Sequence, residues 1–280
     1  MTYREALTYA STLLKQANIP NPALEASLLL GFVLNQSKEY IYTHPFHTLS
    51  PEQKQTLCSL IQKRIQKTPL AYLLGSKEFY GLNFKINPHV LIPRPETELI
   101  VEEVKKHFLP TQNFIFCDLG CGSGCIGLTI AKEFPNSKGV LLDISKQALQ
   151  LAKNNSLSLN LKNHILFVQS NLKKIAFRKP FDLIVSNPPY IATKEQHALP
   201  EDVRLFEPRL ALLAGKTGLL FYPFLKKLVK KHLKPGGIFV AEFGSGQTQA
   251  IQKMFSNFAN LSIIKDLANK DRLVLIQKSI

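Results

Sequence analysis

From about residue 93 onward, short apolar runs alternate with longer amphipathic segments. This alternation constrains the fold strongly, because strands separated by helices lie mostly parallel in one sheet that is covered on both faces. Seven runs have the length and composition of strands: 114–119, 139–143, 165–169, 181–186, 237–242, 261–265 and 273–277. Helices are expected over 97–107, 123–134, 145–157 and 217–233. The last two strands leave no room for a helix between them, so they are predicted to form an antiparallel hairpin at one edge.

The first 75 residues have a different pattern, with apolar side chains at helical spacing and no obvious catalytic group. Asn21-Pro22 and Ser50-Pro51 each read as an N-cap followed by proline at the first helical position. Residues 76–92 then alternate around a glycine, which is typical of a β-hairpin. The expected organisation is a helical bundle over 1–75, a hairpin linker over 76–92 and an α/β domain over 93–280.

The strand predicted over 181–186 is apolar enough to be buried and parallel, and it ends in Asn187-Pro188-Pro189-Tyr190. Open α/β sheets bind ligands at the carboxyl ends of their strands. The two prolines hold the turn rigid, which fixes the Asn187 amide and the Pro188 carbonyl as hydrogen-bonding groups, while Tyr190 supplies a flat wall. Such a set suits a planar NH2 group. Taken alone, the tetrapeptide is also compatible with a plain strand-ending turn.

A second motif directly follows the first strand of the sheet and opens a helix: Asp118-Leu119-Gly120-Cys121-Gly122-Ser123-Gly124. Glycines let backbone approach a ligand closely, and a helix N-terminus offers free N–H groups. Asp143 ends the second strand, where a carboxylate can accept both hydroxyls of a ribose. A dinucleotide fingerprint requires glycine or alanine where Cys125 stands. The alternating glycines preceded by Asp118, which can steer a cationic ligand by charge or through water, fit S-adenosylmethionine better than a pyrophosphate.

Composition narrows the class of protein without naming a partner. The 280 residues carry a net charge of +15, which attracts polyanions in general. The densest cationic cluster (Lys226, Lys227, Lys230, Lys231 and Lys234) is expected to be the solvated face of an amphipathic helix. No apolar run has the length of a membrane span, and no signal-peptide core follows Met1, so we expect a cytoplasmic protein.

Together these motifs resemble class I S-adenosylmethionine-dependent methyltransferases and, among them, the HemK/PrmC family of release-factor glutamine methyltransferases. The resemblance covers nearly the whole chain. Its most specific segments are Ile92-Pro93-Arg94-Pro95-Glu96-Thr97-Glu98, Glu207-Pro208-Arg209 and Ala241-Glu242-Phe243-Gly244 with Gln247. The implied fold is a Rossmann-like seven-stranded sheet with an antiparallel edge hairpin, preceded by a small helical bundle.

The resemblance implies roles for particular residues. The donor is S-adenosylmethionine, and the acceptor is the side-chain amide of the glutamine in the Gly-Gly-Gln motif of class I release factors. Asn187 and Pro188 hold the acceptor NH2, and Pro189 and Tyr190 complete that site. The implied donor-binding residues are Gly120, Cys121, Gly122, Ser123, Gly124, Asp143, Asn171, Leu172 and Asn187. Asn171 and Leu172 flank the adenine, where many relatives have an aspartate and often an aromatic residue. The helical domain is expected to dock the protein substrate.

Three other interpretations were weighed. Asn-Pro-Pro-Tyr also occurs in enzymes that methylate adenine N6 in nucleic acid, but those usually carry a target-recognition domain for which this chain has no room. Cys117, Cys121 and Cys125 recur every four residues, yet a radical-cofactor motif would need cysteine at Gly124, and Cys117 and Cys125 are read as small core residues. A non-catalytic binding module is disfavoured by the intact motifs. We expect a monomer with no metal and no stable nucleic-acid complex.

Overall fold

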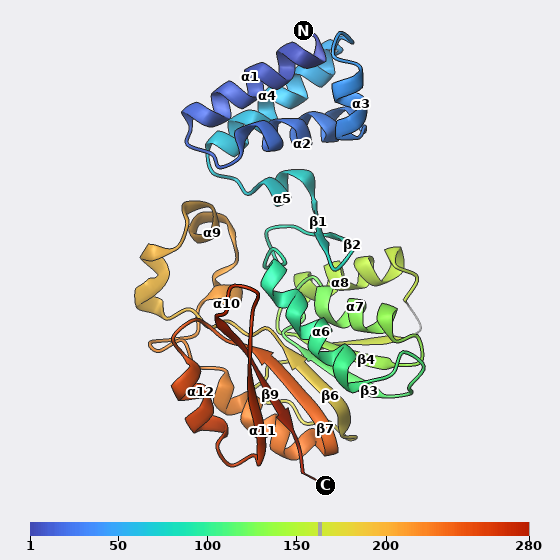
Figure 1. The fold of residues 1–280 in the computed structure, drawn as a ribbon, viewed down its shortest axis with the longest axis vertical. Helices are drawn as coiled ribbons and strands as arrows, with labels where there is room; N and C mark the ends of the chain where they lie inside the picture. The colour runs from blue at the N-terminus through green and yellow to red at the C-terminus, as the bar shows by residue number, and fades with distance from the viewer. Residues whose placement is uncertain (162–163, 280) are drawn as a thin grey trace. The chain divides into compact units, whose positions relative to one another are not determined.

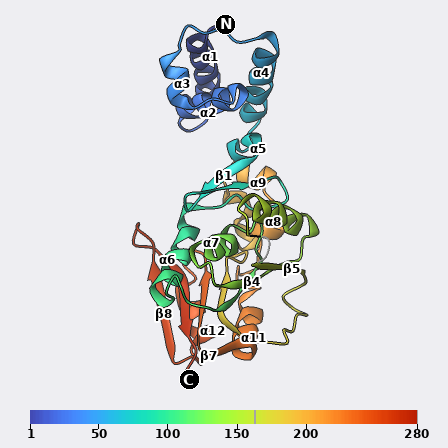
Figure 2. The same cartoon turned by 90° about the vertical axis from the view of Figure 1, so that its right-hand side faces the viewer.

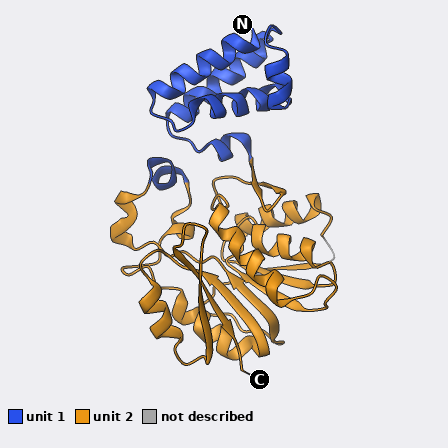
Figure 3. Cartoon of the chain, viewed as in Figure 1, with its two compact units in different colours: residues 1–75, 200–206 blue, residues 76–199, 207–280 orange. Residues whose placement is uncertain are grey.

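The computed structural model describes residues 1–161 and 164–279. The chain separates into two compact units (Figure 3). Unit 1 consists of Met1–Gly75 together with Pro200–Phe206, and unit 2 consists of Ser76–Leu199 and Glu207–Ile280. Each unit encloses apolar cores of its own, since the core residues of unit 1 all lie before residue 75 and those of unit 2 after it.

Unit 1 is helical, with an apolar core that includes Leu14, Leu29 and Leu57. Its helices are α1 (Tyr3–Gln16), α2 (Pro22–Leu34), α3 (Lys38–Thr43), α4 (Pro51–Ile65), α5 (Leu70–Leu74) and α9 (Glu201–Phe206). Ser50 begins α4 with the expected cap, a reciprocal capping box with Gln53. Asn21 is the N-cap of α2 and Pro22 its first residue, as expected, but the Asn21 backbone is left-handed at φ 50° and its side chain makes no capping bond.

Unit 2 contains a seven-stranded sheet in the order β5-β4-β3-β6-β7-β9-β8. The strands are β3 (Ile115–Leu119), β4 (Lys138–Asp143), β5 (Ile165–Gln169), β6 (Phe181–Ser186), β7 (Leu233–Glu242), β8 (Asn260–Lys265) and β9 (Asp271–Gln277). The first five are parallel, whereas β9 runs antiparallel to both β7 and β8. The predicted parallel sheet and its antiparallel edge hairpin are therefore confirmed.

Helices cover both faces of this sheet (Figures 1 and 2). The helices α6 (Glu98–His107), α7 (Cys125–Glu133) and α8 (Lys146–Ser158) pack on one face, and α11 (Tyr222–His232) and α12 (Thr248–Phe255) on the other. Successive strand side chains alternate between the two cores: Phe116 belongs to the first and Cys117 to the second. This double burial explains why the central strands read as continuous apolar runs.

The connections of unit 2 contain elements that sequence periodicity did not reveal. Helix α12 lies between β7 and β8, and two short helices follow β6 within unit 2, η2 (Thr193–Ala198) and α10 (Arg209–Leu212); α9, between them in the chain, belongs to unit 1. The expected hairpin is present as β1 (Ser76–Phe79) and β2 (Leu82–Lys85). Tyr80 and Gly81 both have positive φ, as a two-residue hairpin turn of the primed type requires. A 3-10 turn, η1 (Pro95–Thr97), precedes α6.

Two expectations from composition concern helices. The lysine cluster lies on α11 and just beyond it; Tyr222, Leu225 and Val229 are buried, while Lys227, Lys230 and Lys231 are exposed. The predicted amphipathic helix is confirmed, and its solvated cationic face consists of these three lysines. The prediction is wrong for Lys226 and Lys234, which are half-buried and bond to the Met254 carbonyl and to Asp182. Across the described residues, no helix combines the length and the hydropathy needed to cross a membrane.

Candidate active site

The residues proposed from sequence lie at the carboxyl ends of four neighbouring strands. In the sheet order β5-β4-β3-β6, these are Asn171 after β5, Asp143 as the last residue of β4, the glycine loop at 120–124 after β3 and Asn187 after β6. The chain proceeds from β3 to one side and returns with β6 on the other, so the loop and Asn187 flank the topological switch point where ligands bind in such sheets. The Ser186 hydroxyl donates to the Leu119 carbonyl at 2.7 Å and ties the two strand ends together.

The glycine loop leaves open space above its backbone. Gly120 and Gly122 have φ of +78° and +54°, and a Cβ added at either would meet no atom within 4 Å. The loop is shaped from below, since the Gly120 and Cys121 N–H groups both donate to the Leu142 carbonyl. A ligand can therefore approach the loop backbone closely at these two positions. Cys121 and Ser123, between the three glycines, are both buried.

Helix α7 begins at Gly124, whose φ of +82° makes it the left-handed N-cap. Asp118 is completely buried, and its Oδ2 accepts the Gly127 N–H at 3.0 Å. Its Oδ1 has no hydrogen-bond partner in the described part of the chain. Burial first, and the nearby charge of Asp143 second, raise the pKa of Asp118 to about 7. Asp118 therefore holds the first turn of α7 against the end of β3.

Asp143 connects the second strand to the glycine loop. Its carboxylate accepts the N–H of Gly122 through Oδ2 and that of Ser145 through Oδ1, each at 2.9 Å. Burial raises the pKa of this carboxyl above its usual value, and the backbone bonds oppose the shift. Each carboxylate oxygen can accept a second bond, so the residue fits a ribose diol while it also shapes the loop.

Beyond β5, Asn171 and Leu172 are both half-buried. The Asn171 Oδ1 accepts the Lys173 N–H at 2.9 Å, which leaves its NH2 group as a donor. Leu172 packs against the core beneath α11 and α12. An adenine beside these residues would meet an apolar side chain and an amide donor, and no aromatic ring from either.

Asn187-Pro188-Pro189-Tyr190 forms the turn after β6. The Asn187 Nδ2 donates to the Thr97 hydroxyl at 3.0 Å. In the described part of the chain no group donates to Asn187 Oδ1, and this oxygen does not belong to the fully buried atoms that lack a partner. No described residue donates to the Pro188 carbonyl. Tyr190 is held at both ends, by Gln247 Nε2 on its carbonyl at 2.9 Å and by Glu242 on its hydroxyl. Two acceptors and a fixed ring are thus available on one turn.

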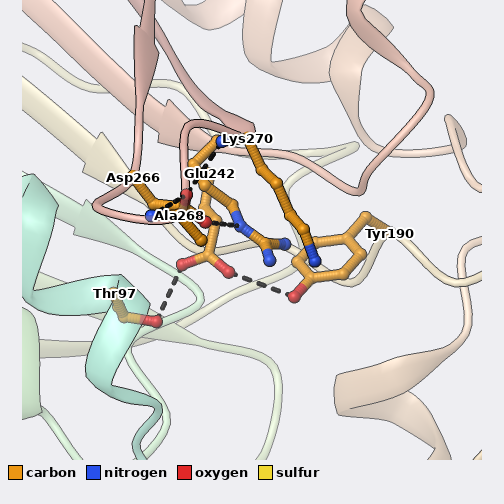
Figure 4. A network of polar contacts seen from close by, with 7 residues as sticks. Thr97, Tyr190, Glu242, Asp266, Ala268 and Lys270 are labelled. Carbon is orange, nitrogen blue, oxygen red and sulfur yellow. Dashed lines mark hydrogen bonds and ion pairs between the residues drawn. The ribbon is translucent and has the colours of Figure 1, made fainter.

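A buried carboxylate organises this turn. Figure 4 shows Glu242 between Thr97 and Tyr190, with one bond to each. Thr97 donates to Oε2 at 2.7 Å and Tyr190 donates to Oε1 at 3.1 Å. Burial raises the pKa of Glu242, whereas these two bonds and the charge of Arg272 oppose the shift. Burial and the Glu242 charge also raise the pKa of Tyr190, which keeps its hydroxyl a donor.

Curated relatives match along the whole length of the chain. A protein of Caulobacter vibrioides named release factor glutamine methyltransferase is 38% identical over 277 residues, which cover 98% of this chain and 96% of that protein. A Clostridium botulinum protein of the same name is 38% identical and covers 99% and 100%. The chain belongs to the release factor glutamine methyltransferase family. The PrmC N-terminal domain matches residues 5–75, and the methyltransferase small domain matches residues 95–207.

Solved structures support the fold of this family member. A methyltransferase from Pyrococcus furiosus superposes with a TM-score of 0.55 at 20% identity, over 78% of this chain and 98% of that one. The 16S rRNA methyltransferase RsmC of T. thermophilus, solved with AdoMet and guanosine, has a TM-score of 0.52 at 17% identity, over 72% and 49%. Both likenesses concern the fold alone, which is that of a class I methyltransferase.

The segments that distinguish the family converge in unit 2. Arg94 pairs with the buried Glu207, which also accepts the Ile92 N–H at 3.2 Å. Thr97 lies in the same family segment as Arg94, Glu242 lies in the segment Ala241-Glu242-Phe243-Gly244, and the sequence indicated no individual role for either. Only their presence in the segments of resemblance pointed to these two residues. Their contact could not be inferred from the sequence, because they are 145 positions apart.

The three regularly spaced cysteines lie in the interior. Cys117, Cys121 and Cys125 are buried free thiols, and burial raises the pKa of each. Thiols of this kind are poor nucleophiles and poor metal ligands. Cys117 and Cys125 pack as the small core residues that the sequence suggested. Within residues 1–161 and 164–279, no cluster of three His, Cys, Asp or Glu side chains is arranged to hold a metal ion.

Proposed function

We propose that this chain transfers a methyl group from S-adenosylmethionine to the side-chain amide nitrogen of glutamine in the Gly-Gly-Gln motif of class I release factors. The observation that supports it most is the orientation of Asn187 beside the switch point. Its NH2 donates a hydrogen bond to Thr97, so its Oδ1 remains free to accept a hydrogen bond from the NH2 of the substrate glutamine. The names of relatives at 38% identity support the choice of acceptor.

The donor side of the proposal rests on the glycine loop and Asp143. A Cβ at Gly120 or Gly122 would meet no atom within 4 Å, so the methionine end could approach the loop backbone there, and Asp143 retains acceptor capacity for ribose hydroxyls. Asn171 and Leu172 would flank the adenine. The loop and Asn187 follow adjacent strands, β3 and β6, so donor and acceptor would meet at the switch point.

The proposed transfer is a direct displacement. The glutamine amide nitrogen attacks the methyl carbon, the carbon–sulfur bond breaks, and the sulfonium becomes a neutral thioether. The nitrogen then loses one proton to solvent. An amide nitrogen is a poor nucleophile because its lone pair is delocalised. Acceptors at Asn187 Oδ1 and the Pro188 carbonyl would favour charge on that nitrogen and align it with the methyl group.

Mass spectrometry of a release factor incubated with the protein and S-adenosylmethionine tests this proposal. We expect a gain of one methyl group on the glutamine of the Gly-Gly-Gln motif. Asn187→Ala should reduce transfer by about 10²-fold or more, in line with the loss of one oriented hydrogen bond in the transition state. Affinity for S-adenosylhomocysteine should stay within a few-fold, because the loop and Asp143 remain.

Parallel reactions with DNA and RNA provide the control for acceptor class. The relatives' names favour a protein acceptor, so nucleic acid should remain unlabelled under conditions in which the release factor is methylated. Methylation of adenine in either nucleic acid with an unmodified release factor would overturn the proposal. Undiminished transfer by Asn187→Ala would overturn the acceptor role of that residue only.

A further inference from the structure

We propose that Thr97 and Glu242 are positioning residues that fix which end of the Asn187 amide faces the acceptor. The inference rests on the proposed function, because it concerns how the same site presents its hydrogen-bond acceptor. Asn187 lies in the turn after β6, Thr97 ends η1 directly before α6, and Glu242 ends β7. Two hydrogen bonds join them in a chain, from Asn187 to Thr97 and from Thr97 to Glu242, and we call these two bonds the relay.

The direction of these bonds follows from the chemistry of the three groups. An ionised carboxylate only accepts hydrogen bonds, so the Thr97 hydroxyl has to donate its one proton to Glu242 Oε2. The Thr97 oxygen is then available only as an acceptor. The Asn187 group that faces Thr97 must therefore be the NH2, and Oδ1 must face away. The Glu242 carboxylate, two hydrogen bonds from Asn187, thus determines that the amide oxygen and not the NH2 faces the acceptor site.

The polarity matters because an Asn amide is nearly symmetric in shape. Rotation by about 180° would exchange O and NH2 at little steric cost. The rotated amide would point an NH2 group at the NH2 of the incoming glutamine, donor against donor. The relay makes that rotation costly, since it would also place Oδ1 against a Thr97 oxygen that has no proton left to give.

Glu242 is itself held in place by burial and by hydrogen bonds. The residue is 1% exposed. Its Oε1 accepts the Tyr190 hydroxyl, and its backbone carbonyl accepts the Tyr222 hydroxyl at 2.9 Å. Tyr190 lies on the same turn as Asn187, so the Glu242 carboxylate holds one residue of the motif directly and the other through Thr97. Figure 4 shows the two direct bonds, to Tyr190 and to Thr97. A buried charge of this kind is costly unless all its oxygens are paired.

The charge on Glu242 should make transfer sensitive to acid. The charged and titratable groups around it are Arg272 of β9, Glu96 of η1, Tyr190 beyond β6 and Tyr222 of α11. Arg272 supports ionisation and is itself paired with Asp266, whereas Glu96 opposes it. Once Glu242 is protonated, it can donate to Thr97, and the direction of the relay is no longer imposed. The turnover rate at saturating donor should then fall as the pH is lowered.

Thr97→Val tests the relay, because valine keeps the shape and removes the hydroxyl. The matched control is Thr129→Val in α7, a completely buried threonine whose hydroxyl has no hydrogen-bond partner in the described part of the chain. We expect Thr97→Val to lower kcat on the order of 10²-fold with KM for the release factor within about threefold. Thr97→Ser, which restores the hydroxyl, should recover most of the rate, and Thr129→Val should behave as wild type.

Glu242→Gln separates geometry from charge. Its carboxamide oxygen can still accept from Thr97 while its NH2 donates to the Tyr190 oxygen. Transfer should therefore persist at a reduced rate, without the fall in rate at low pH (the acid limb) that is expected of wild type. A kcat of Thr97→Val equal to that of Thr129→Val would overturn the relay while leaving the proposed function intact. So would an unchanged acid limb in Glu242→Gln.

A spectroscopic measurement keeps the relay testable if the acceptor is wrong. The Asn187 side-chain NH2 signals, assigned by their loss in Asn187→Ala, should exchange slowly with solvent in wild type and Thr129→Val and faster in Thr97→Val. Equal exchange in all three would overturn the relay. Wild-type protein that leaves the release factor unmethylated would overturn the proposed function alone, since the NH2 exchange does not depend on the acceptor.

Discussion

Three carboxylates at the site carry raised pKa values, and burial is the largest cause for each. Asp143 and Glu242 each have both oxygens hydrogen-bonded, to backbone N–H groups in one case and to hydroxyls in the other. Asp118 has only one bonded oxygen. Of the three, ionisation of Asp118 should therefore lower the stability of the folded state most, because one oxygen of this buried carboxylate accepts no hydrogen bond.

Asp118 should make the protein less stable as the pH rises. Its pKa is about 7 in the folded chain against an ordinary value of 3.8, so between these values the folded state binds more protons than the unfolded state. The free energy of unfolding then falls with rising pH across that window, by at most about 1.4 kcal/mol per pH unit from one group, and levels off above it.

Asp118→Asn should remove this contribution, since the amide has no charge to lose. Urea unfolding at about pH 5 and about pH 7.5 should show a smaller loss of stability in the variant than in wild type. Residual pH dependence is expected from Asp143 and Glu242, whose pKa values are raised in the same direction. An identical loss in both proteins would contradict the buried, uncompensated state of Asp118.

Asp143→Ala should weaken donor binding, because the carboxylate is proposed to accept the ribose hydroxyls. We expect a loss of about 1.5–3 kcal/mol in affinity for S-adenosylhomocysteine, measured by calorimetry. The variant also loses the bonds to Gly122 and Ser145, so lower affinity alone would not identify the ribose contact.

The control for Asp143→Ala is an S-adenosylhomocysteine analogue without the ribose 2′-hydroxyl. Wild type should bind it less tightly than the parent compound, and Asp143→Ala should bind the two about equally. A preference for the parent compound that survives in the variant would assign the ribose contact to another residue.

At the scale of elements, helix α7 lies against the sheet with no space to spare at Gly127. A Cβ there would come 2.7 Å from Leu141 Cδ1 and 3.0 Å from Asp118 Oδ2. Leu141 is completely buried in β4, so its side chain has no solvent-exposed space into which it could move. Helix α7, which begins directly after the glycine loop, is thus packed against β4 at a glycine that has no positive φ. Nucleotide-binding α/β folds have the same close helix–strand packing.

Gly127→Ala should destabilise the protein, although alanine is the better helix former by about 1 kcal/mol. Overpacking of this contact should cost about 1–3 kcal/mol in the free energy of unfolding. Lys132→Ala, at an exposed position of the same helix, should change stability by less than about 0.5 kcal/mol. A stabilised Gly127→Ala in thermal or urea unfolding would show that the helix can move away from β4.

A second contact at this scale joins the hairpin to the glycine loop. Asn155 of α8 is 1% exposed, and its Nδ2 donates to the carbonyls of Lys85 and Ser123 at 3.0 and 2.9 Å. Its Oδ1 accepts the Lys85 N–H at 2.9 Å. The hairpin β1–β2 is therefore attached to the wall of the donor site by one side chain.

At the scale of the whole chain, the cores of the two units share no residue. Removal of residues 1–75 takes away the whole core of unit 1 and leaves every core residue of unit 2 in place. The deletion should therefore reduce methylation of intact release factor more than methylation of a free Gly-Gly-Gln peptide, since a protein substrate needs more docking surface than one side chain offers.

The deletion is interpretable only in protein that still binds S-adenosylhomocysteine, because segment 200–206 groups with unit 1 and loses its surroundings. The ratio of kcat/KM values on protein and peptide is the measurement. Equal proportional loss on both substrates would assign unit 1 a supporting role in folding, and docking by residues 1–75 would be wrong. The expected monomer remains a prediction that light scattering can check.

The sequence by itself determined the order of elements, the sheet and the positions of the two motifs. These features are local: apolar periodicity separates strands from helices, and positive φ at Gly120, Gly122 and Gly124 requires residues without a side chain. Elements that lack a strong periodic signal escaped, such as α12, whose eight residues lie between two strands. The family segments pointed to the site as a whole without ranking residues inside it.

Only the tertiary structure decided which side chains act on one another. Thr97 and Glu242 are 145 positions apart and become partners because α6 begins beside the end of β7. Likewise, burial of Asp118 and the packing of Gly127 arise from how α7 is placed on β3 and β4. Hydrogen-bond direction and desolvation depend on three-dimensional neighbours, so the residue types show which groups can bind and the fold determines which bonds form.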